Sequence, residues 1–123
     1  MERNVHVGGL YDAAKIGESE EERKRAQNDL HKGIELSIKI SSPLVSFHPP
    51  SFKSKNLRDE ILLSEAKARF LELVEEEADF CDRNGVKLAL ESFCYTPFIF
   101  TDLEDFMQFV SHFRSSELGV LLE

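Results

Sequence analysis

The sequence predicts an α/β fold with a parallel sheet, in which about four strands alternate with three helices. Four short apolar runs have the length and composition of strands, at residues 4–7, 44–48, 86–91 and 118–123. The longer segments between them repeat apolar residues at the three- and four-residue spacing of amphipathic helices. Alternation of this kind produces right-handed strand–helix–strand units, so the strands are expected to run parallel.

Length and composition are typical of one globular domain. The chain has 123 residues, 41% hydrophobic and 31% charged, which is enough for a real core. It contains no apolar run long enough to cross a membrane, and residues 1–9 lack the apolar stretch of a secretory signal. The net charge of −8 opposes nucleic acid as a partner, because duplex binding depends on neutralising phosphates with lysine and arginine. We therefore expect a cytoplasmic protein with no nucleic-acid and no membrane partner.

The first half of the chain supplies two strands and the first helix. "NVHV" at residues 4–7 reads as the first strand. Ser19 and Glu22 have the spacing of a capping box, so a helix is expected to begin there. Its apolar residues repeat every four positions: Ala26, Leu30, Ile34 and Ile38. The second strand is "LVSFH" at residues 44–48, and a double proline follows it.

The second half supplies two more helices and two more strands. The second helix places one apolar face on Phe70, Leu73, Val74, Ala78 and Cys81. Asn84 and Gly85 stop this helix before the third strand at residues 86–91. Thr101 and Glu104 form the capping box expected for the third helix, and the last strand is "LGVLLE" at residues 118–123. The apolar face of the third helix comprises Phe106, Phe109, Val110 and Phe113.

Two acidic runs and two cysteines are assigned structural roles. The runs at residues 18–23 and 75–79 are interpreted as solvated helix surface. Cys81 and Cys94 lack zinc or redox spacing, and Cys81 is expected to be a buried free thiol on its helix face.

Potential metal ligands stand at or near the end of every predicted strand: His6, His48, Glu91 and Glu123. They are separated by roughly one strand–loop–helix unit each, so they should meet at one end of a parallel sheet. Two imidazoles and two carboxylates suit a divalent cation such as Mn²⁺, Mg²⁺, Co²⁺ or Zn²⁺. For His6 the alternative is a polar residue at a strand end, and for Glu123 it is a solvated final residue.

Alternation along the strands separates two faces of the sheet. The face with the candidate ligands is mixed and partly polar. The opposite face is uniformly apolar and is expected to pack against helices: Val5, Val7, Val45, Phe47, Leu88, Leu90, Val120 and Leu122. A barrel with a site at the top of its interior has this division. Tyr11, Asp12 and Tyr95 lie in loops that follow strands, and they are candidates to line a pocket.

Three stretches, "VSFHPP", "GVKLALESF" and "LGVLLE", resemble successive strand ends of the xylose isomerase-like TIM barrels. That superfamily includes sugar phosphate isomerases and epimerases, the tagatose epimerase group and the type-four apurinic endonucleases. The resemblance implies that residues 1–123 are a partial (β/α)8 TIM barrel domain, corresponding roughly to strands two to five. A full barrel takes about 250 residues.

The resemblance also implies roles for the candidate residues. Glu91 matches the family glutamate that binds the divalent metal and acts as acid and base in the epimerases. Glu123 matches a metal-binding position that is usually Asp. His48 and His6 match positions that are metal ligands in the endonuclease branch and vary in the sugar branch. We therefore assign Glu91 as catalytic, His48 and Glu123 with Glu91 as metal ligands, and His6, Tyr11 and Tyr95 as substrate-binding residues.

The leading functional hypothesis is a divalent-metal-dependent isomerase or epimerase of a sugar or sugar phosphate, acting through an enediolate. One alternative is an apurinic endonuclease-type phosphodiesterase, which the two histidines favour and the net charge opposes. Another is a non-catalytic fragment that self-associates. The family's later metal-binding His and second catalytic carboxylate have no counterpart, so this chain alone is expected to be weakly active or inactive. Four strands cannot close a barrel, so a homo-oligomer is also expected.

Overall fold

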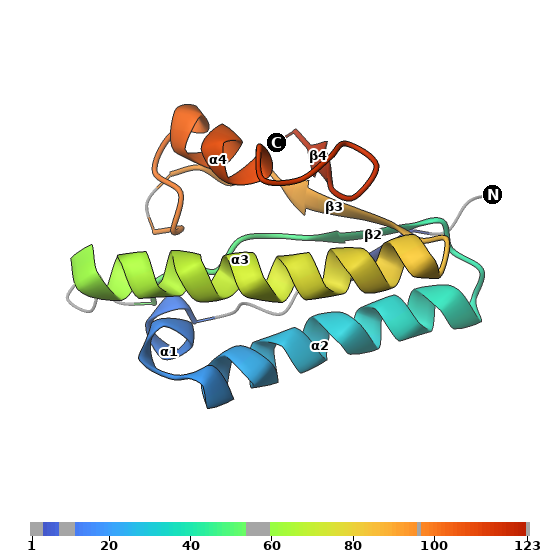
Figure 1. The fold of residues 1–123 in the computed structure, drawn as a ribbon, viewed down its shortest axis with the longest axis horizontal. Helices are drawn as coiled ribbons and strands as arrows, with labels where there is room; N and C mark the ends of the chain where they lie inside the picture. Colours follow the sequence, from blue (N-terminus) through green and yellow to red (C-terminus); the bar gives the residue numbers. More distant parts are fainter. Residues whose placement is uncertain (1–3, 8–11, 54–59, 96, 123) are drawn as a thin grey trace.

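The computed structural model describes residues 4–7, 12–53, 60–95 and 97–122. Its centre is a sheet of four parallel strands in the order β1-β2-β3-β4. Figure 1 labels β2, β3 and β4. The strands are β1 (Val5–Val7), β2 (Leu44–Phe47), β3 (Lys87–Glu91) and β4 (Gly119–Leu121). Each strand pairs with the next along the chain, as in successive units of a TIM barrel. The predicted parallel α/β fold is confirmed.

The described residues form three helices of eight residues or more and one shorter helix. The predicted three are α2 (Glu20–Lys39), α3 (Glu60–Arg83) and α4 (Leu103–Val110). Helix α1 (Ala13–Glu18) was not predicted, because its six residues are too few for a clear apolar repeat. Asp12 accepts a hydrogen bond from the Ala14 backbone N–H and caps this helix. It also lines a surface pocket, together with Lys15 and Lys53.

Local signals explain where the helices begin and end. Ser19 caps α2 by accepting a hydrogen bond from the Glu22 backbone N–H, at 3.2 Å, as predicted. The predicted cap of α4 is wrong by one residue: Asp102 accepts from the Asp105 N–H at 2.8 Å, and its carboxylate also suits the positive helix N-terminus. Gly85 has a φ of 71°, in the left-handed region that favours glycine, and it reverses the chain after α3.

One face of the sheet packs against the helices and forms the core. Val45, Phe47, Leu88 and Leu90 are fully buried on this face. The helices contribute a second layer of buried residues: Leu30, Ile34, Phe70, Leu73 and Val74. Two predicted members are wrong, because Ile38 at the end of α2 and Leu122 beyond β4 are exposed.

The other face of the sheet is the interior face, which a closed barrel would enclose. The register aligns His6, Ser46, Ala89 and Gly119 across the four strands on this face. Glu91 lies two residues beyond Ala89 and therefore points to the same side. The predicted division into a mixed face and an apolar face is confirmed.

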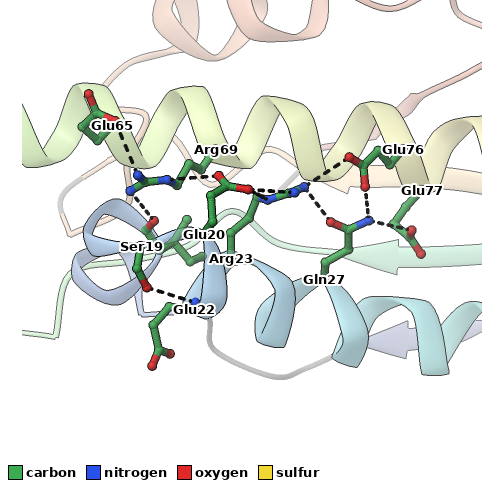
Figure 2. Close-up of polar contacts among 10 residues, drawn as sticks. Ser19, Glu20, Glu22, Arg23, Gln27, Glu65, Arg69, Glu76 and Glu77 are labelled. Atoms are coloured by element: carbon green, nitrogen blue, oxygen red, sulfur yellow. Dashed lines mark hydrogen bonds and ion pairs between the residues drawn. The ribbon is translucent and has the colours of Figure 1, made fainter.

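A ladder of charged and amide side chains fastens α2 to α3, which run side by side (Figures 1 and 2). Arg23 on α2 donates hydrogen bonds to Glu20, Gln27 and Glu76. Its side chain is only 7% exposed. Gln27 donates in turn to Glu76 and to the buried Glu77. The prediction that both acidic runs are solvated surface is therefore wrong for Arg23 and Glu77, because each is buried between the helices with polar partners.

The described part of the chain contains no helix that is both long and apolar enough to cross a membrane.

Candidate active site

A buried carboxylate and an imidazole meet on the interior face. Glu91 is the last residue of β3, and its side chain is 9% exposed. His6 lies in the middle of β1 with its side chain 51% exposed, and its Nδ1 is 2.9 Å from Glu91 Oε1. Burial of an unpaired carboxylate is costly. The imidazole partner offsets that cost, so Glu91 is not a strand-end residue that merely reaches water.

A serine on the intervening strand holds this pair. Ser46 on β2 lies in register with His6, and its Oγ is 3.1 Å from His6 Nδ1. Ser46 is itself buried. The strand order therefore places Ser46 between the strands that carry His6 and Glu91, where its hydroxyl can orient the imidazole.

His48 stands beside this pair at the end of β2. Its ring is buried, and the ring centroid is 6.4 Å from that of His6. His48 Nδ1 is 3.0 Å from the Pro49 carbonyl oxygen. A carbonyl only accepts hydrogen bonds, so Nδ1 carries the hydrogen and Nε2 keeps its lone pair in the neutral ring. The structure thus brings His6, in the middle of β1, close to His48 and Glu91 at the carboxyl ends of β2 and β3.

Three aromatic rings, the aromatic platform, follow β3 and border His48: Phe93, Tyr95 and Phe98. Phe93 and Phe98 stack with their centroids 4.9 Å apart and their planes 13° from parallel. Tyr95 stands edge-on to both rings, with centroids 6.1 and 5.3 Å away. The His48 ring meets Phe93 and Phe98 edge-on at 5.9 and 6.0 Å. The platform is therefore continuous with the histidine–glutamate cluster.

Backbone hydrogen bonds fasten the loop after β3 to the loop after β2. The Phe52 N–H donates to the Pro97 carbonyl at 2.9 Å, and the Ile99 N–H donates to the Pro50 carbonyl at 3.1 Å. Ser51 and Phe98 form an antiparallel bridge between these two contacts. The platform and His48 are consequently carried by two loops that support each other.

The other residues predicted for the site are Tyr95, Tyr11 and Glu123. Tyr95 is on the platform and is 54% exposed. Tyr11 and Glu123 lie outside the described residues. Within the described ranges, no group of three or more His, Cys, Asp and Glu side chains could hold a metal ion. His6, His48 and Glu91 therefore supply suitable donor atoms without forming a complete three-ligand centre among themselves.

Three members of the site were not predicted as site residues: Ser46, Phe93 and Phe98. The signal for Ser46 was present, because the same strand alternation that groups His6 with Glu91 also places Ser46 on their face. No comparable signal identified Phe93 and Phe98. Their stacking depends on how the loop folds back over the neighbouring loop, and no local periodicity encodes that path.

A family model described as xylose isomerase-like TIM barrel matches residues 4–123. The chain belongs to the xylose isomerase-like TIM barrel family. No curated protein matches the sequence. This family includes isomerases, epimerases and apurinic endonucleases, and its members often bind divalent metals and small-molecule sugars.

Membership of the xylose isomerase-like TIM barrel family explains the location of the cluster. Active sites of TIM barrels lie at the carboxyl ends of the strands, where the strand-to-helix loops meet. His48, Glu91 and the aromatic platform occupy that end of the sheet. The described residues carry four of the eight strands that a closed barrel requires.

Proposed function

We propose that the protein is a divalent-metal-dependent isomerase or epimerase that acts on a sugar or sugar phosphate. The observation that carries this proposal is the buried Glu91 carboxylate, held 2.9 Å from His6 Nδ1 on the interior face, with His48 alongside. The match of this chain to the family model, over residues 4–123, supports the same proposal. We also propose that the chain corresponds to roughly strands two to five of the barrel.

Glu91 is the residue that moves the proton. A carboxylate at the carboxyl end of a barrel strand is well placed to take a proton from the carbon next to a carbonyl, giving an enediolate. Return of the proton to the other face of that carbon gives an epimer, and return to the neighbouring carbon gives an isomer. His6 holds one carboxylate oxygen, so the orientation of Glu91 is fixed before substrate binds.

The donor chemistry of the site fits a divalent cation. Imidazole nitrogen and carboxylate oxygen are ligands of Mn²⁺, Co²⁺ and Zn²⁺, and carboxylates also bind Mg²⁺. The Pro49 carbonyl fixes the His48 tautomer that leaves Nε2 free, which is the arrangement of a metal-binding histidine. Glu91 and His48 would hold the ion, with Glu123 as a further ligand. When bound, a divalent cation supplies polarisation of the substrate carbonyl and its neighbouring hydroxyl oxygen.

The first test is metal affinity. Glu91→Gln keeps the shape of the side chain and removes its charge, so Mn²⁺ binding measured by calorimetry should weaken by about tenfold or more. Glu104→Gln, an exposed glutamate on α4, is the matched control and should bind as the unaltered chain does. Equal affinity of the Glu91 and Glu104 variants would remove Glu91 from the ligand set.

The second test follows proton transfer directly. The chain is incubated in D₂O with a ketose and Mn²⁺, and NMR follows deuterium entering the carbon next to the carbonyl. Exchange requires only removal of the proton, so it can be detected even where complete turnover is slow. We expect slow exchange that Glu91→Gln abolishes. Exchange that survives in Glu91→Gln would assign the base elsewhere.

An apurinic endonuclease is the second candidate function. The 6.4 Å spacing of the His6 and His48 rings favours it, since two imidazoles beside a glutamate suit a metal cluster that acts on a phosphodiester. The net charge of −8 opposes it. Binding of an abasic DNA duplex that weakens steeply with added salt, measured by fluorescence anisotropy, would favour this candidate over the isomerase.

A further inference from the structure

The aromatic platform points to the class of sugar that the site accepts. We propose that Phe93, Tyr95 and Phe98 select an unphosphorylated sugar by binding the C–H face of its carbon chain. This inference rests on the proposed function, because it specifies the substrate of the same site.

The rings of the platform are more exposed than the fully buried phenylalanines of the core. Five phenylalanines of the core are at most 2% exposed: Phe47, Phe52, Phe70, Phe100 and Phe106. Phe93 and Phe98 are only partly buried, and Tyr95 is 54% exposed. These rings leave apolar surface in water at the strand ends. A ligand that covers this surface lowers the free energy of the complex.

Direct contacts join the platform to the reacting groups. Phe93 and Phe98 flank His48, His48 lies beside His6, and His6 contacts Glu91. Glu91 is also only two residues before Phe93 in the chain, and the Phe93 N–H donates to the Glu91 carbonyl at 2.9 Å. A substrate whose carbonyl end lies near Glu91 therefore extends its carbon chain along the rings.

The electrostatics of the rings favour a neutral sugar. The face of an aromatic ring is electron-rich, so it attracts the weakly positive C–H groups of a sugar and repels an anion. A phosphate dianion on the platform would also meet the Glu91 carboxylate nearby and a chain whose net charge is −8. Both effects act against a sugar phosphate at this position.

The platform is organised before any ligand binds. Phe93 and Phe98 are stacked, and the Phe98 N–H donates to the Tyr95 carbonyl at 2.8 Å, which closes a turn in the loop. The hydrogen bonds from Phe52 to Pro97 and from Ile99 to Pro50 hold the loop at both sides of Phe98. Little conformational entropy is then lost on binding, so even a weak stacking contact contributes to affinity.

The test measures binding in metal-free buffer, with D-fructose and fructose 6-phosphate as probes. Saturation-transfer NMR with irradiation of the aromatic protons should give strong signals from the carbon-bound protons of fructose. Fructose should bind more tightly than fructose 6-phosphate. Tyr95→Ala should weaken fructose binding roughly three- to tenfold, whereas Tyr95→Phe keeps the ring and should retain it. Tyr95 is exposed, so neither substitution is expected to unfold the chain.

Leu103→Ala, which removes an exposed apolar side chain on α4, is the matched control and should leave binding unchanged. The proposal is overturned if fructose 6-phosphate binds as tightly as fructose, if Tyr95→Ala binds as the unaltered chain does, or if neither sugar binds. Its failure is separable from failure of the proposed reaction. Fructose binding without deuterium exchange would contradict the isomerase and leave the platform standing.

Discussion

Replacement of Arg23 by alanine tests how strongly the ladder between α2 and α3 stabilises the fold (Figure 2). Arg23 is 7% exposed, and its guanidinium donates to Glu20 Oε2 at 3.0 and 3.2 Å, to Gln27 Oε1 at 2.8 Å and to Glu76 Oε1 at 3.4 Å. The helices it joins carry much of the core that supports β2 and β3, so its loss is expected to lower global stability.

The magnitude follows from what the substitution removes. Alanine lacks two buried methylenes of the arginine stem, a loss of about 1.6 kcal/mol at 0.8 kcal/mol per methylene. The side chains of Glu20 and Glu76 are 52% and 55% exposed, so water solvates them once the guanidinium is gone. Each ion pair therefore contributes only about 0.5 kcal/mol. We expect Arg23→Ala to lower the free energy of unfolding by about 2–3 kcal/mol.

Two further variants separate packing from charge. Arg23→Met keeps most of the buried volume and should cost less than about 1 kcal/mol, because a hydrophobic replacement avoids burying a charge. Arg25→Ala is the exposed control, since its pairs with Glu21 and Glu22 are held in water and should contribute less than about 0.5 kcal/mol.

Urea unfolding followed by circular dichroism at pH 7 gives the three values. Equal destabilisation by Arg23→Ala and Arg25→Ala would refute the assignment of Arg23 to a buried contact.

The pH dependence of the free energy of unfolding is a second test of the ladder. The pKa of Glu76 is lowered, chiefly by the hydrogen bond from Gln27, from its ordinary 4.5. The stability that ionised Glu76 contributes to the fold is therefore fully present above pH 4.5, and it should be lost as the pH falls through the lowered pKa.

Two other outcomes follow from burial and from the open sheet. Burial raises the pKa of the Cys81 thiol to about 12. Iodoacetamide at pH 8 should therefore modify Cys94 alone in the folded chain, and both cysteines in denaturant. Mass spectrometry that finds Cys81 modified without denaturant would contradict its burial. A polypeptide of these 123 residues should self-associate, because its described sheet has edges at β1 and β4; a monodisperse monomer at high concentration in light scattering would contradict this.

Periodicity predicted the sheet well because the strands are simple. Each is a short apolar run between helices, and strand alternation alone assigned His6 and Glu91 to one face and Phe47 and Leu90 to the other. The Asn84–Gly85 turn was equally direct, since Gly85 supplies the left-handed conformation that the chain reversal needs.

The features that were missed depend on contacts between distant segments. Glu77 shares the apolar face of α3 with Leu73, Val74 and Cys81, at three- and four-residue spacing, but its charge makes its burial unexpected from the sequence alone. It is buried because Gln27 and His31, on another helix, provide hydrogen-bonding partners. The platform is a similar case, because the position of Phe98 is set by Pro50 and Phe52 on the previous loop. Local patterns cannot encode partners that lie about fifty residues away.

The hydrogen bonds between the loops after β2 and β3 also have a consequence for engineering. The carbonyls of Pro50 and Pro97 each accept a hydrogen bond from a backbone N–H of the other loop. The conformation of each loop therefore depends on the other. A graft that exchanges residues 92–100 alone would place a foreign loop against a surface shaped for the original one. To alter which sugars fit, the two loops should be transplanted as a pair, with the strand ends that carry His48 and Glu91 left in place.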